Sequence, residues 1–579
     1  MPGSFFGLNI AVSGLFTAQR DLDIVNHNLS NINTPGYSRQ RAIQSASRAI
    51  SLMDGTGMMG TGAEVTGVKR IRDEYLDFKY WSENVSLGEW SAKQEALSDI
   101  EATFNEPSDS GFTTIMSDFF NSLQELTKDP SSGAVRALVK ERGVTLAKYF
   151  NSTAAHFEEL QKDLDYKVRT KVEEVNSLAK QIQQLNRQIY ISELDGSAAN
   201  DMRDQRTVLV DKLSKIVNVE AYEVVVGTTP SGKEDRHFVV TISGKALVDH
   251  FNVSQLAVEQ RNSSNKVNEE DVENLFNVKW ADGNSLNIKG GELKGYIDIR
   301  DGNEGSVNKD NGIVSPDCKG IPYYQKKLNE FVRTFARAFN EGYIDADGDK
   351  GYDAGEAFTD TNGNGIYDAA ETFTDANGNG IYDLGEAYDA GEMTPGAGHA
   401  GGYGYNTTDS GIRFFTKKGI GNQPISSEDF LGTAATDQQI YDLYEGITAK
   451  NFAVSSDILD DYNKIATSDT GGEAENTNIL KKLLEYRQND DMFSEGAPED
   501  FMKSLVATLG IDEQQSINYK SNQQAVVNQI SNRRLSESGV LIDEEFTDLI
   551  KFQQAYNASA KMIQTMSEVY DTLINGLFV

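Results

Sequence analysis

The last stretch of the chain, residues 543–579, has the clearest hydrophobic pattern. Steps of three and four residues from Leu549 meet apolar or aromatic side chains at eight of nine positions, and only Ser559 is polar. Asp543 stands where a side-chain N-cap is expected, and no proline interrupts the run. The pattern predicts a helix that buries one narrow stripe against another helix. Packing on its own domain is the simpler alternative. The apolar positions are Leu549, Phe552, Tyr556, Ile563, Met566, Tyr570, Leu573 and Leu577.

The N-terminus carries a second stripe with the same steps. Its apolar positions are Leu8, Val12, Leu15, Leu22 and Leu29, and its polar positions are Gln19, Asn26 and Asn33. Pro35-Gly36 ends the predicted helix. Polar residues at core positions cost stability but can fix register. Because neither helix is expected to be stable alone, the two ends of the chain are predicted to pair, so that residues 1–40 and 543–579 form a terminal helical coiled-coil assembly domain.

The middle of the chain changes pattern several times. Residues 38–72 are predicted to be extended, and residues 73–217 are helical throughout. Residues 41–217, 321–344 and 450–542 are assigned to one elongated helical bundle domain with a β-hairpin, although the spacing alone also allows a compact helical domain. Residues 218–320 are predicted to be β-rich, and residues 396–449 to be a mixed β and loop segment of the same outer domain. The predicted class is mainly α with β insertions, an α+β multidomain protein.

Residues 345–395 form an acidic insert with three tandem repeats at a fifteen-residue period. The second and third copies match every ligand position of the calcium loop of an EF-hand, with Gly365 and Gly380 at the turn. The first copy has Lys350 at the turn position and is less complete. The predicted calcium ligands are Asp345, Asp347, Asp349, Asp353, Glu356, Asp360, Asn362, Asn364, the Ile366 carbonyl, Asp368, Glu371, Asp375, Asn377, Asn379, the Ile381 carbonyl, Asp383 and Glu386.

Only three residues separate the last ligand of one loop from the first ligand of the next. This spacing leaves no room for the flanking helices of an EF-hand, so we expect a calcium-stapled stack of turns with a structural role. Without helices to hold the loops, the expected dissociation constant is about 10⁻⁴–10⁻³ M. The alternative is an acidic, glycine-rich linker without metal.

Two short motifs at opposite ends of the chain point to a family. Residues 28–37 have the sequence NLSNINTPGY, which resembles the N-terminal signature of bacterial flagellar rod, hook and hook-associated proteins. The continuation Ser38-Arg39-Gln40 is similar to the hook-associated members. Residues 538–545, 552–556 and 571–575 resemble the C-terminal end of the same proteins. The resemblance covers roughly residues 1–220 and 500–579.

The resemblance implies a structural component of the bacterial flagellum, located at the junction between hook and filament. It implies that copies form a ring of the flagellar tube, with hook protein below and hook-associated protein 3 or other filament-side proteins above. It also implies extracellular placement after unfolded export through the flagellar type III system, without a cleaved signal peptide, and an export chaperone on the C-terminal helix. The predicted assembly interface consists of Leu8, Val12, Leu15, Leu22, Leu29, Leu549, Phe552, Tyr556, Ile563, Met566, Tyr570, Leu573 and Leu577.

Composition narrows the partners and the alternatives. The formal net charge of −34 argues against nucleic acid as a partner. The sequence contains no run of eighteen apolar residues, so we expect no membrane insertion. The five histidines show no zinc spacing or nucleophile pattern, so we expect no enzyme. A calcium-dependent extracellular adhesin or surface-layer protein would explain the insert but not the two terminal stripes. Flagellin would explain the stripes but not the rod-and-hook motif.

Overall fold

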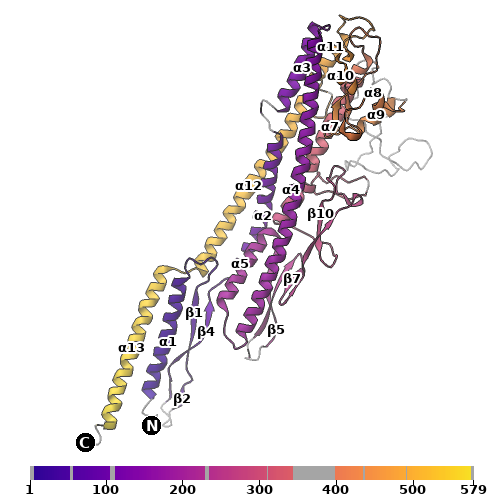
Figure 1. Cartoon of the computed structure of the whole chain (residues 1–579). Coiled ribbons are helices and arrows are strands. Elements are labelled where there is room, and N and C mark those ends of the chain that lie inside the picture. Colours follow the sequence, from indigo (N-terminus) through magenta and orange to yellow (C-terminus); the bar gives the residue numbers. More distant parts are fainter. Residues whose placement is uncertain are drawn as a thin grey trace, which may run out of the picture.

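The computed structural model describes residues 6–51, 57–104, 108, 111–228, 232, 234–309, 311–342, 398–434, 437–490 and 492–575. The molecule is long and mainly helical, with small sheets along one side (Figure 1). Both chain ends lie at one end of the molecule, which we call the foot. A bundle of long helices, the rod, leads from the foot to a head at the other end, and this shape favours the elongated bundle over the compact one.

The foot contains α1 (Phe6–Ser30) and α13 (Ile542–Asn575), which lie side by side in opposite directions (Figure 1). Gly7 and Gly14 of α1 face Met566 and Ser559 of α13, respectively: a Cβ added to Gly7 would lie 3.0 Å from Met566 Cε. The small residues let the two helices approach closely. The chain ends therefore pair within one molecule.

A β-hairpin follows α1 and lies beside it. Strands β1 (Gln40–Ala46) and β4 (Ala63–Arg70) pair antiparallel, with Gln40 opposite Arg70 and a register shift after Ile43. The short strands β2 (Ile50–Ser51) and β3 (Met58–Met59) extend the hairpin. Thr17 of α1 donates a hydrogen bond to the Ala63 carbonyl, which ties the hairpin to the helix.

The rod is built from α2 (Glu74–Phe104), α3 (Phe112–Lys128), α4 (Gly133–Glu193), α5 (Asn200–Ile216) and α12 (Pro498–Ser538). Helix α4 has 61 residues and is about 90 Å long at 1.5 Å per residue. Its side chains at steps of three and four from Val168 to Ile189 are buried against the other helices. Ser132 caps this helix, because its side chain accepts a hydrogen bond from the Val135 N–H.

The outer β region lies along the rod. Strands β5 (Val219–Thr228), β6 (Glu234–Ile242), β7 (Lys245–Asp249) and β8 (Asn252–Val253) form an antiparallel sheet in that order. Strands β9 (Leu256–Gln260) and β10 (Phe276–Trp280) form a separate pair, and α6 (Glu292–Asp301) packs on the rod. One hydrophobic cluster runs without interruption from the rod into this sheet and into the head. The domain boundaries proposed from the sequence remain predictions.

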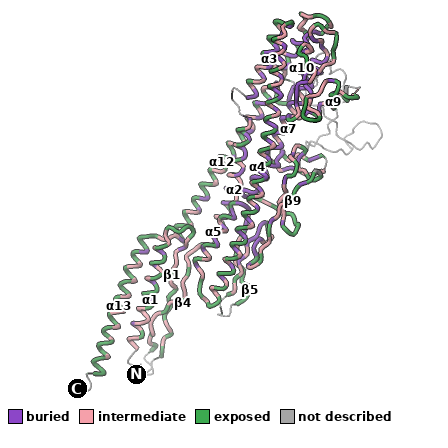
Figure 2. Tube along the Cα trace, in the orientation of Figure 1, coloured by how far each residue is buried: buried purple, intermediate pink, exposed green. Residues whose placement is uncertain are grey.

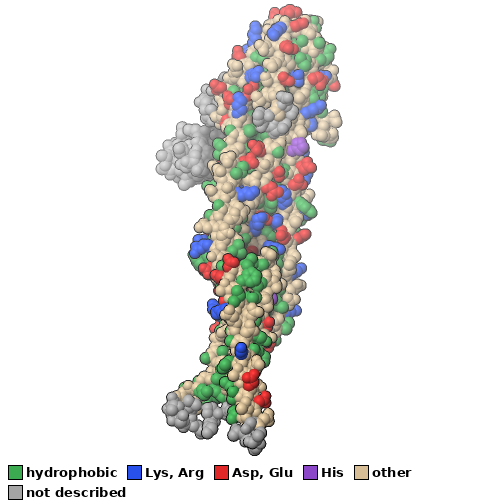
Figure 3. All heavy atoms as spheres, turned by 90° about the vertical axis from the view of Figure 1, so that its left-hand side faces the viewer, with side chains coloured by type: hydrophobic (Ala, Val, Ile, Leu, Met, Phe, Trp, Pro, Cys, Tyr) green, Lys and Arg blue, Asp and Glu red, His purple; other side chains and the backbone are tan. Residues whose placement is uncertain are grey.

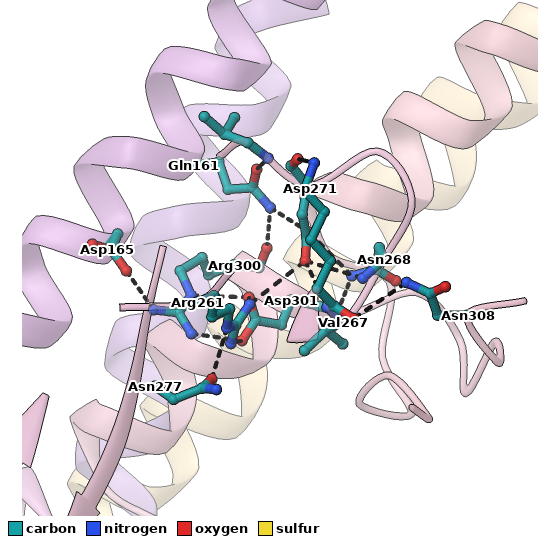
Figure 4. Close-up of polar contacts among 12 residues, drawn as sticks. Gln161, Asp165, Arg261, Val267, Asn268, Asp271, Asn277, Arg300, Asp301 and Asn308 are labelled. Atoms are coloured by element: carbon teal, nitrogen blue, oxygen red, sulfur yellow. Dashed lines mark hydrogen bonds and ion pairs between the residues drawn. The ribbon is translucent and has the colours of Figure 1, made fainter. Parts of the chain in front are cut away.

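A buried ionic network fastens the outer region to α4 (Figure 4). Arg300 at the end of α6 donates to Asp165 of α4 at 2.6 Å and to Asp301 at 2.7 Å, and Arg261 pairs with the same Asp301 at 2.6 Å. Gln161 of α4 donates to the Arg300 carbonyl. Burial alone would raise the pKa of Asp301, but the two arginines hold it well below its usual range. Because every buried charge here has a partner, the network can fix one orientation of the outer region.

The head is built around α7 (Ile321–Glu341) and a cluster of aromatic rings. Phe331 and Phe335 of α7 stack, and Phe335 and Phe339 contact each other and Phe415 in the short sheet of β11 (Phe415–Lys417) and β12 (Phe452–Val454). The remaining helices are α8 (Ser427–Leu431), α9 (Asp437–Glu445), α10 (Ser456–Asp460) and α11 (Asn478–Glu485). Single 3₁₀ turns occur at Ser263–Asn265, His399–Gly401, Ile420–Asn422, Tyr462–Lys464 and Tyr486–Gln488.

The predicted calcium ligands, residues 345–386, lie outside the described residues. The nearest described residues are Gly342 before this segment and Gly398 after it. Gly342 ends α7 with φ +81°, and a Cβ added to Gly398 would lie only 2.4 Å from the Gly342 nitrogen. The polypeptide therefore leaves the head and returns to it at one point.

Candidate assembly interface

The stripe predicted for the C-terminal helix is the face that α13 turns toward α1. Leu549, Phe552, Tyr556, Ile563, Met566 and Tyr570 are half-buried, whereas most other side chains of α13 are exposed. Leu573 is 48% exposed, and Leu577 lies outside the described part of the chain. The helix begins at Ile542, so Asp543 lies in its first turn and not at the N-cap as the sequence had suggested.

The stripe that α1 buries within the chain is shifted by one residue from the predicted stripe. The buried residues are Ala11, Thr17, Ala18, Asp21, Val25 and Asn28. The predicted Leu8, Val12, Leu15, Leu22 and Leu29 are only half-buried. Hydrophobicity misled the prediction because the contact with α13 uses small residues, and because buried Asp21 and Asn28 have hydrogen-bonding partners. The larger apolar side chains of α1 are therefore still partly available to a further partner.

The motif at residues 28–37 forms the joint between the foot and the rod. The Asn28 amide donates to Glu545 of α13 at 3.1 Å and to the Gln40 carbonyl at 3.0 Å. The Asn28 side-chain oxygen accepts from the Gln40 N–H and from the Tyr37 hydroxyl. One buried amide thus connects α1, α13 and the start of the hairpin. Gly36 has φ +79°, and a Cβ there would lie 2.1 Å from Val208 of α5, so only glycine fits.

Arg39 holds the start of α13. Its guanidinium contacts Glu545 at 2.6 Å, Glu544 at 2.5 Å and Asp548 at 3.4 Å, while its backbone N–H donates to the Ser538 carbonyl at the end of α12. The Glu545 side chain is 1% exposed and is the one buried residue within α13. Burial alone would lower the pKa of Arg39, but its bonds to Glu544 and Glu545 raise it. The side chain therefore stays charged and neutralises the carboxylates.

A second ionic network continues from this joint into the rod. Asp204 of α5 accepts from the Ser38 N–H and hydroxyl and pairs with Arg70 of β4 at 2.9 Å. Asp77 of α2 pairs with Arg72 at 2.6 Å and with Arg534 of α12 at 2.9 Å. The hairpin, α2, α5 and α12 are therefore joined by a network of charges. These pairs could not be predicted from the sequence, because an aspartate in a helical pattern does not reveal which distant arginine it meets.

The foot has almost no buried apolar core of its own. Figure 2 shows buried residues along the rod and head, and mainly half-buried and exposed residues along α1 and α13. Large apolar side chains of both helices reach solvent in the single chain: Phe16, Phe546, Ile550, Met562, Val569, Leu573 and Ile574. An exposed apolar surface of this kind is typical of a protein–protein interface. The arrangement is suited to association with other chains.

The described residues offer little for other chemistry. They contain no group of three or more His, Cys, Asp or Glu side chains that could hold a metal ion. None of the described helices combines the length and apolar character that crossing a membrane requires.

Comparisons with known proteins match both the foot and the rod. The family model described as flagellar hook-associated protein FlgK helical domain matches residues 97–356. A model of the flagella basal body rod protein matches residues 8–37, and one of the flagellar basal body rod FlgEFG protein C-terminal region matches residues 531–576. The two rod models thus match the two segments that pair in the foot.

Relatives match along the whole chain. Flagellar hook-associated protein 1 of Bacillus subtilis is 28% identical, covering 100% of this chain and 99% of the relative. Over its whole length the chain is similar to flagellar hook-associated protein 1. The proteins of that name from Escherichia coli and Salmonella typhimurium are 28% and 27% identical over 98% of this chain. The solved structure of the flagellar hook junction protein FlgK from Burkholderia pseudomallei aligns with 80% of this chain and 100% of its own chain, at 15% identity and a TM-score of 0.46.

Replacing Arg39 by Met is expected to loosen α13. The substitution leaves the buried Glu545 carboxylate without its cation, which should cost about 3 kcal/mol, or roughly 100-fold faster hydrogen exchange of the first α13 amides. Arg48→Met, at an exposed position of the same hairpin, is the matched control and should leave exchange unchanged. Unchanged exchange in Arg39→Met would show that apolar contacts alone hold α13.

The stability of the foot should depend on Asp21. Burial raises the pKa of Asp21 to about 6, although Lys551 of α13 partly opposes the shift. The folded foot therefore binds a proton that the unfolded chain has already released, and its stability falls as the pH rises from about 4 to 6. Asp21→Asn should stabilise the α1–α13 pair by about 1–2 kcal/mol at pH 7 and by much less at pH 4.5.

Hydrogen exchange of α1 and α13 at both pH values measures this effect. Asp23→Asn, at an exposed position of the same helix, is the control. An equal effect of Asp21→Asn at pH 4.5 and pH 7 would contradict the assignment.

Proposed function

We propose that this chain is a structural component of the bacterial flagellum that forms the junction between hook and filament by self-assembly of its terminal helices. The observation that carries the proposal is the paired foot, whose apolar side chains are half-exposed in a single molecule. The full-length match to flagellar hook-associated protein 1 supports the location. A calcium-dependent adhesin is not supported, because the relatives that match the whole chain are flagellar.

The mechanism we propose is burial of the foot by neighbouring copies. The half-buried residues of α1 and α13, among them Leu8, Leu15 and Ile563, would be covered when copies pack side by side as coiled-coil helices in the tube wall. Apolar burial contributes about 25 cal/mol per Å², so a foot without its own core gains most of its stability from assembly. The role is structural, and no enzymatic step is part of it.

The finer points of this role are also proposals. The copies would form a ring with hook protein below and hook-associated protein 3 or other filament-side proteins above. The chain would reach the cell exterior unfolded, through the flagellar type III export system, with a chaperone on the C-terminal helix. The exposed apolar side chains of α13 support the last point, since such a surface needs protection before assembly.

We further propose that residues 345–386 bind calcium as a structural ion. The support is the spacing of the carboxylates and amides in the sequence, which matches a calcium loop in two copies and nearly matches it in a third. Such a dense set of carboxylates would repel one another until a cation neutralises them.

Replacing Ile563 by Asp tests the assembly mechanism. A charge in the α1–α13 stripe should abolish assembly and leave the melting of the rod and head unchanged, because the foot shares no core with them. Ile563→Leu keeps volume and hydrophobicity and should assemble normally. Electron microscopy of cells that carry each variant, with an assay for filament protein in the medium, measures the outcome. Bare hooks and shed filament subunits are expected for Ile563→Asp, whereas intact filaments would rule out the mechanism.

Calorimetry of the full chain tests the calcium proposal. Titration with calcium should show binding with an apparent dissociation constant of about 10⁻⁴–10⁻³ M. Replacing both Asp360 and Asp375 by Ala removes the first ligand of the two complete loops and should abolish most of the heat. No heat from the unsubstituted chain at millimolar calcium would refute the proposal.

A further inference from the structure

The foot meets the rod at a convex elbow on one flank and a groove on the other. The elbow comprises residues 535–550, where α12 ends at Ser538 and α13 begins at Ile542. In Figure 1 the elbow lies on the flank formed by α12 and α13, whereas the hairpin and the base of the rod lie on the other side of α1. The groove separates the hairpin from the base of the rod and is lined by the whole of β4.

The elbow is apolar and acidic. Five of its large apolar side chains are 48–60% exposed: Leu535, Leu541, Ile542, Phe546 and Ile550. Figure 3 shows this flank, with hydrophobic side chains gathered over its lower half. Glu537 and Asp543 are exposed acidic residues of the elbow, whereas Glu544, Glu545 and Asp548 pair with Arg39. An exposed apolar surface of this kind is typical of a site that binds another protein.

The groove has the opposite charge and a matching apolar wall. Its volume is about 1260 Å³, and six basic and three acidic side chains line it. Arg20 and Lys69 are exposed there, and no ion pair among the described residues involves either of them. Phe16 of α1 and Ile43 of β1 also line the groove and are 64% and 48% exposed. Strand β4 pairs with β1 on one edge, and no other described strand pairs with it.

We propose that the elbow of one copy docks into the groove of the next copy. The two surfaces have complementary charge, both expose apolar side chains, and they lie on opposite flanks of the same molecule. A contact between two different surfaces of identical chains repeats around a ring or helix instead of stopping at a dimer. This contact rests on the proposed assembly function and names a lateral contact that is distinct from the α1–α13 stripe.

Charge reversal tests the contact in the full-length protein. The groove variant carries Arg20→Glu and Lys69→Glu, and the elbow variant carries Glu537→Lys and Asp543→Lys. All four residues are exposed, so folding should be unaffected, which thermal melting checks. Sedimentation should show self-association weakened by about tenfold or more in each variant, because like charges then meet across the contact. A chain with all four substitutions should assemble again, because both surfaces have exchanged their charge.

Mixing the two variants adds a test of charge pairing. The acidic groove of the groove variant accepts the basic elbow of the elbow variant, and the unchanged acidic elbow of the groove variant fits the unchanged basic groove of the elbow variant. The mixture should therefore self-associate with the two variants alternating, whereas each variant alone should associate only weakly.

Other outcomes would overturn the proposal. Normal assembly of both variants, or no recovery in the fourfold variant, would show that these surfaces do not meet. Retained self-association together with loss of binding to a hook-protein, filament-side or chaperone partner would assign the elbow to that partner. In each of these cases the proposed function survives if Ile563→Asp still abolishes assembly. If Ile563→Asp assembles normally, the assembly mechanism itself has failed.

Discussion

The foot is attached to the rod by charged and polar groups, not by a hydrophobic core. Arg39 neutralises the buried Glu545, Asn28 links both terminal helices to the hairpin, and the second network leads on to Asp77 and Arg534. Such bonds are directional, so they fix the angle between foot and rod, whereas apolar contacts tolerate sliding. The buried carboxylates in turn require their cations, since an unpaired charge at these positions would be far more costly than an exposed one. This joint therefore sets the position of α1, α13 and the hairpin relative to the rod.

The division between rod and foot follows from where apolar side chains are buried. The rod and head share one continuous hydrophobic cluster, which makes them a stable unit in a single molecule. The foot places small residues at the α1–α13 contact and leaves its larger apolar side chains half-exposed. A chain with this division can fold its rod first and complete its foot only when neighbours supply the missing surface. The distribution of apolar side chains alone can therefore set the order in which the rod and then the foot become stable.

The sequence predicted the large features well, because they depend on periodicity. The stripe of α13, the helical character of residues 73–217 and the change to strands at Val217 all follow from regular spacing of apolar residues. The predicted stripe of α1 is misplaced by one residue because Gly7 and Gly14 carry no hydrophobic signal, and because the buried Asp21 is a charged residue type. The pairs Arg39–Glu545 and Arg534–Asp77 join residues hundreds of positions apart, and spacing contains no information about them. Local patterns predict single helices and strands, but the pairing of charged residues that are distant in sequence is visible only in the folded structure.

The meeting of Gly342 and Gly398 has a consequence for the evolution of this chain. Residues 343–397 are inserted at a point where the fold already closes, so the head does not depend on how long the inserted segment is. The entropic cost of closing a flexible loop grows only with the logarithm of its length, which makes insertion or loss at this point inexpensive. Descendants of this protein could therefore lose the segment, lengthen it or exchange it for another module, while the foot keeps the geometry that neighbouring copies require.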